Sequence, residues 1–141
     1  MERLDNFLRL LKESGESALI FLSSKYNART EETIKNIFSG VKIDFIKEDL
    51  SESAKIDRLF GKSLREGSLL VIYLDPDTPP VVMRRLEQIF EDGYIQTNTG
   101  RGFRKVEPVE GWRTLVIINR DRINENEFAL RRLFTRKLVV G

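Results

Sequence analysis

The sequence contains no cysteine and no histidine. Without cysteine the chain cannot form disulfides, thiolate-ligated zinc sites or a thiol nucleophile. Without histidine it lacks the usual general base and the most common metal ligand of proteins. Any catalysis would therefore depend on carboxylates, lysine, arginine or hydroxyl groups.

Long apolar segments and an excess of one charge are also missing. The longest apolar run, from Leu69 to Leu74, is far too short to cross a membrane, and the N-terminus resembles neither a signal peptide nor an apolar span. The 24 basic and 22 acidic residues leave a net charge of only +2, which is a weak indication of nucleic-acid binding. We expect a cytoplasmic protein with no membrane partner, and the charge-rich composition is typical of a thermophile.

The hydrophobic pattern predicts one domain, residues 1–141, with alternating helices and short buried strands. Apolar residues at helical spacing predict helices over residues 2–13 and 30–38, a short helix around 56–60, a helix capped by Thr78 and ending at Gly93, and a helix over 128–134. Apolar runs predict strands over 18–22, 41–46, 69–74, 114–118 and 137–140, and residues 94–107 are typical of a β-hairpin. Strands separated by helices indicate a parallel sheet covered on both faces, which is the α/β class.

The order of several short motifs resembles the core of AAA+ ATPases, P-loop NTPases of the MoxR/dynein-related type. The motifs are the buried strand 68–74, Thr78-Pro79-Pro80, a helix ending in Glu91-Asp92-Gly93, a hairpin, a strand ending at Asn119, and Ala129-Leu130-Arg131-Arg132-Leu133-Phe134. The resemblance covers roughly residues 18–140. It implies a three-layer α/β/α domain with a mostly parallel five-stranded sheet in the order 5-1-4-3-2, an inserted hairpin and no C-terminal helical lid.

Two departures from the family pattern predict that hydrolytic activity has been lost. In the family a Gly-x-x-x-x-Gly-Lys-Ser/Thr loop follows the first strand, whereas residues 23–30 here read Ser-Ser-Lys-Tyr-Asn-Ala-Arg-Thr. Both glycines are absent and Arg29 stands where lysine belongs, so the backbone amides lose the conformations that cradle phosphate. The acidic pair of the family falls on Tyr73 and Leu74, and neither side chain suits Mg²⁺ or orients water. In a shifted register Asp75 is a weak candidate metal ligand, followed by Pro76 instead of glutamate.

The resemblance also marks candidate binding residues, each with a simpler alternative. Arg29, Thr30 and Asn119 are a remnant of a nucleotide site, or else ordinary turn residues with Thr30 as a helix cap. Arg131 and Arg132 match a family arginine that reaches a neighbouring subunit's ATP, or else form a solvated helix face. Four hairpin residues are suited to contacting nucleic acid, namely Arg101, Phe103, Arg104 and Lys105. The simpler alternative is a solvated hairpin with no nucleic-acid contact.

From the sequence we hypothesise a catalytically inactive, AAA+-like interaction or regulatory subunit. It requires no cofactor, and its partner is another protein or a second copy of the chain. One alternative is a small nucleic-acid-binding protein that uses the basic hairpin. Another is a nucleotide binder that senses ATP without hydrolysing it.

Overall fold

A computed structural model describes residues 2–22, 28–47, 52–74, 78–98, 101–119 and 127–140. Its twelve elements follow the alternation predicted from the sequence. They are α1 (Glu2–Ser14), β1 (Ala18–Leu22), α2 (Ala28–Ile37), β2 (Ile43–Ile46), α3 (Ser53–Glu66), β3 (Leu69–Leu74), α4 (Pro80–Asp92), β4 (Ile95–Asn98), β5 (Phe103–Val106), β6 (Arg113–Asn119), α5 (Glu127–Leu133) and β7 (Lys137–Val140).

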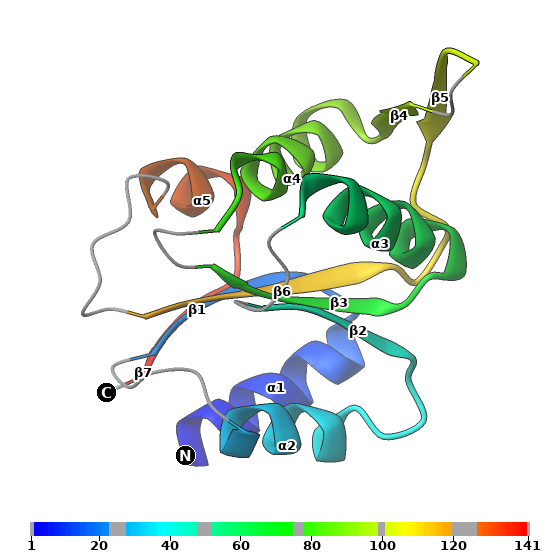
Figure 1. Cartoon of the computed structure of the whole chain (residues 1–141). Helices are drawn as coiled ribbons and strands as arrows, with labels where there is room; N and C mark the ends of the chain where they lie inside the picture. Colours follow the sequence, from blue (N-terminus) through cyan, green and yellow to red (C-terminus); the bar gives the residue numbers. More distant parts are fainter. Residues whose placement is uncertain are drawn as a thin grey trace.

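Five strands form one parallel sheet in the order β2-β3-β6-β1-β7. Numbered along the chain without the hairpin, this is the predicted order 5-1-4-3-2, with β1 between β6 and β7. Helices α1 and α2 cover one face of the sheet, and α3, α4 and α5 cover the other (Figure 1). The predicted three-layer α/β/α architecture is therefore confirmed.

The continuous apolar strands are explained by burial on both faces. Along β3, Leu70, Ile72 and Leu74 join the apolar cluster beneath α3, α4 and α5. The alternate residues Leu69, Val71 and Tyr73 join the cluster beneath α1 and α2. Each large apolar side chain buried in this way contributes about 1.5–3 kcal/mol to folding, so the sheet is held from both sides.

The boundaries of α3 and α4 differ from the prediction. The expected short helix around residues 56–60 is the first half of α3, which continues through Gly61 and ends at Gly67, whose φ of 68° is left-handed. Helix α4 begins at Pro80 with Pro79 as its N-cap, not with Thr78. The reason is that a residue before proline is disfavoured in the helical conformation, so Pro79 stays extended, with ψ of 140°.

The predicted hairpin is also confirmed. Strands β4 and β5 pair antiparallel as a separate two-stranded sheet, and the ribbon extends beyond the end of α4 (Figure 1). Ile95 and Val106, which are paired at its base, are 0% and 4% exposed and anchor it in the core. The backbone N–H of Val109 then donates to the carbonyl of Leu64 on α3 at 3.0 Å. The hairpin is thus fastened beside α3.

Candidate functional site

The carboxyl edge of the sheet is the first place to look, because ligands of open parallel α/β sheets bind there. At the end of β3, Tyr73 is 3% exposed and Leu74 is 1% exposed, and Leu74 pairs in register with Ile118 of β6. The two positions predicted for the acidic pair are therefore buried in the two apolar clusters. They do not fit a Mg²⁺ ion, which requires oxygen ligands. The weak candidate Asp75 lies outside the described residues.

The segment after β1 is described from Ala28 onward, so most of the altered P-loop, residues 23–27, lies outside the described residues. Arg29 is exposed in the first turn of α2, and Thr30 is buried, with 6% exposure. The interpretation of Thr30 as the helix cap is wrong, because α2 already begins at Ala28. Alanine and arginine are better helix formers than threonine, which favours this earlier start.

A small pocket of about 250 Å³ opens where β1, β6 and β7 end. Asn119 and Arg131, two of the sequence-predicted site residues, both line it. The Arg131 guanidinium lies 4.4 Å from the centre of the Phe21 ring and donates to Glu127 Oε1 at 3.0 Å. The structure therefore brings Arg131 and Asn119 together and engages Arg131 within its own chain. Arg132 lies next to it and is exposed.

The four candidate residues of the hairpin are all exposed. Phe103 shows 76% of its surface. Lys105 lies over the ring of Tyr94 at 4.2 Å and pairs with Glu107 at 3.4 Å. Arg101 and Arg104 are on the same ribbon, so the predicted grouping of three basic residues and one aromatic residue is present at the surface.

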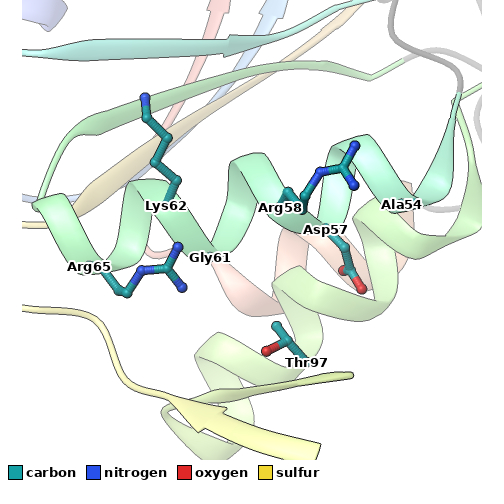
Figure 2. Close-up of a pocket in the computed structure, with 7 residues that line it drawn as sticks. All are labelled: Ala54, Asp57, Arg58, Gly61, Lys62, Arg65 and Thr97. Carbon is teal, nitrogen blue, oxygen red and sulfur yellow. The ribbon is translucent and has the colours of Figure 1, made fainter. Parts of the chain in front are cut away.

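A larger cavity of about 520 Å³ lies between α3 and the hairpin. It is lined by Ala54, Asp57, Arg58, Gly61, Lys62 and Arg65 of α3 and by Thr97 of β4, as Figure 2 shows. Its volume is comparable to that of small-molecule sites in proteins, roughly 300–1,000 Å³.

The charges around this cavity are predominantly positive. Asp57 is neutralised by Arg85 of α4, which donates to both carboxylate oxygens at 2.6 and 2.7 Å. Lys62 pairs with Asp44 at 3.4 Å, and this carboxylate raises the pKa of Lys62 above its usual value, so the amine stays protonated. Arg58 and Arg65 are exposed and form no ion pair with any described carboxylate.

The sequence analysis did not identify this cavity. A signal was available, since Arg58, Lys62 and Arg65 follow the i, i+4, i+7 spacing that places side chains on one face of a helix. The spacing alone does not show that the hairpin folds across that face. Among the described residues, no cluster of acidic side chains could hold a metal ion, and no helix is long and apolar enough to cross a membrane.

No protein-family model matches this chain, and no curated protein matches its sequence. Among solved structures, that of NtrX from Brucella abortus, crystallised in complex with ADP, is similar with a TM-score of 0.64 at 12% identity. The likeness covers 98% of this chain and 34% of the NtrX chain, so this chain spans about a third of that protein. At this identity the likeness concerns the fold alone.

This likeness indicates a P-loop/AAA-like or receiver-type fold. The order of the strands in the sheet differs between these two folds. Flavodoxin-like folds, which include receivers, have the order 2-1-3-4-5, with the first strand beside the second and third. Here β1 lies between β6 and β7, and β2 lies at the far edge beside β3. The topology thus agrees with the order implied by the AAA+ resemblance.

Proposed function

We propose that this chain is an AAA+-like module of the MoxR/dynein-related type that acts as an interaction or regulatory subunit without turning over ATP. The observation that carries the proposal is the end of β3. Where the family has two acidic residues, this chain has Tyr73 and Leu74, both buried in apolar clusters. A side chain packed in a core is unavailable to a metal ion or to an attacking water.

The physical argument concerns what phosphoryl transfer needs. The reaction depends on positioning and on electrostatic stabilisation by Mg²⁺ and basic groups, because the protein contributes little covalent chemistry. Loss of the residues that hold the ion and orient the water removes most of that assistance. The helices that a partner could contact do not depend on those residues, since among the described residues the sheet and both apolar clusters form without them.

The experiment is phosphate release from Mg·ATP by the purified chain, compared with the Arg29→Ala and Asp75→Asn variants. We expect the three proteins to release phosphate at the same background rate. Turnover by the unmodified chain that either substitution abolishes would refute the proposal. The comparison is informative because a contaminating ATPase would be unaffected by both substitutions.

A second candidate function is nucleotide sensing without hydrolysis. It is favoured by the pocket at the carboxyl edge, where Asn119 and Arg131 provide polar groups beside β1, and by the fold likeness to NtrX, which was crystallised with ADP. Against it, about 250 Å³ is small for a nucleotide. Calorimetric titration with ATP, ADP and GTP decides the matter, and an absence of heat with all three removes this candidate.

A further inference from the structure

We propose that the cleft between α3 and the β4–β5 hairpin binds single-stranded nucleic acid, with Arg58 and Arg65 contacting the phosphates. The cleft shares no lining residue with the pocket at the carboxyl edge of the sheet. The inference is therefore independent of whether the chain binds or hydrolyses ATP.

The floor of the cleft is a row of basic side chains on α3. Arg58, Lys62 and Arg65 span about 10 Å along the helix at 1.5 Å per residue. The two arginines are exposed and have no described carboxylate as a partner. A guanidinium presents several N–H donors in a planar fork, which matches phosphate oxygens better than an ammonium group does. The row therefore offers at least two separated phosphate contacts.

Gly61 is the feature that shapes this floor. It lies in the middle of α3 and is not among the glycines with positive φ, so the backbone does not require glycine there. A Cβ built at Gly61 would lie 3.3 Å from Nη1 of Arg65. The Arg65 guanidinium thus occupies the space above Gly61, as Figure 2 shows. Glycine lets this cation lie low across the helix, inside the cleft.

The hairpin forms the opposite wall. Thr97 lines the cleft and pairs in register with Arg104, so both side chains lie on the ribbon side that faces α3. Phe103, which is 76% exposed and adjacent to Arg104, points to the other face of the ribbon, because successive side chains of a strand alternate. Single-strand-binding proteins use a basic groove that follows the nucleic-acid backbone, which is the component that the arginines of this cleft supply.

The test is fluorescence anisotropy with a labelled oligothymidylate of roughly 20 nucleotides, at about 50 mM and about 200 mM salt. The unmodified chain should bind, more weakly at the higher salt. The double variant Arg58→Ala/Arg65→Ala should bind at least about tenfold more weakly and, by losing two phosphate contacts, show a log–log salt slope shallower by about 1.4.

The matched control is Arg3→Ala/Arg9→Ala, which removes the same charge from two exposed positions of α1 on the opposite face of the sheet. It should keep the affinity of the unmodified chain. Equal losses in the two double variants would show a general charge effect and overturn the proposal, as would an absence of binding by the unmodified chain. Competition by thymidine monophosphate at the same nucleotide concentration would reveal a mononucleotide site and would also overturn it. Thermal denaturation of each variant verifies that these surface changes leave the fold intact.

Discussion

Replacing Gly61 by alanine should stabilise the protein while weakening the proposed nucleic-acid site. Alanine in a helix interior is more favourable than glycine by about 1 kcal/mol. The new Cβ would meet only the tip of Arg65, Nη1 at 3.3 Å and Cζ at 4.0 Å. Because that tip belongs to a flexible, exposed side chain, it can move by the few tenths of an ångström that the new Cβ requires. The net gain is about 0.5–1 kcal/mol, which raises Tm by about 2–5 °C.

Thermal and urea denaturation measure this gain, and Gly93→Ala supplies the matched control. Gly93 follows α4 with a φ of 84°, and a Cβ added there would have no neighbouring atom within 4 Å. The same substitution there forces alanine into a left-handed conformation and should destabilise the protein by about 1–2 kcal/mol. Opposite signs at the two glycines are the expected result. A loss of about 1 kcal/mol or more at Gly61 would refute the placement of Arg65.

The oligonucleotide titration adds a readout that stability alone does not move. Gly61→Ala displaces the Arg65 guanidinium, so affinity should fall although the fold becomes more stable. In the Arg65→Ala background the same glycine substitution should have little further effect, because the cation that it displaces is already gone. Full additivity of the two losses would contradict the assigned role of Gly61.

Three further substitutions test the packing and the charges around the sheet. Thr114→Val removes the buried hydrogen bond that the Thr114 hydroxyl donates to the backbone carbonyl of Leu70 at 2.7 Å. The free energy of unfolding in urea should fall by about 0.5–1.5 kcal/mol, and an unchanged urea midpoint would contradict this. Ser63→Ala removes the hydroxyl that accepts a hydrogen bond from the indole N–H of Trp112 at 3.0 Å. We expect the free energy of unfolding to fall by about 1–3 kcal/mol and the tryptophan emission to shift, whereas an unaltered spectrum would argue against the bond. The hydrogen bond from Arg136 lowers the pKa of Glu16 below its usual value, so its contribution to stability is present above the unfolded pKa and is lost as pH falls through the folded pKa. Glu16→Gln should therefore flatten the acid side of the stability profile below about pH 4.5, the ordinary pKa of glutamate, and an identical profile would show that this pair is not coupled to folding.

The sheet could be predicted from the sequence because its strands are buried on both faces. Runs such as residues 69–74 are apolar without alternation, a pattern that few other elements of this length produce. The strand order came from the resemblance, not from the runs themselves. The hairpin was also predictable, since two short arms flank a segment that contains Gly100 and Gly102.

The misplaced boundaries of α3 and α4 have local causes, whereas the missed cleft has a long-range cause. Thr78 satisfied the usual cap pattern, but the effect of Pro80 on Pro79 delays the start of α4 by one residue. The predicted helix around residues 56–60 was too short, because the helix continues through Gly61 with the apolar residues Phe60 and Leu64 buried on its inner face. The cleft was missed because Arg58 and Thr97 are 39 residues apart in the sequence and meet only after the hairpin folds against α3.

A single-turnover experiment tests the central claim most directly. The chain is mixed in excess over labelled Mg·ATP, so that even one hydrolysis per protein molecule is detected. The apolar end of β3, with Tyr73 and Leu74 in the core, predicts that ATP is consumed no faster than in buffer alone. Conversion of ATP to ADP at a rate that rises with protein concentration, and that Arg29→Ala abolishes, would contradict the account.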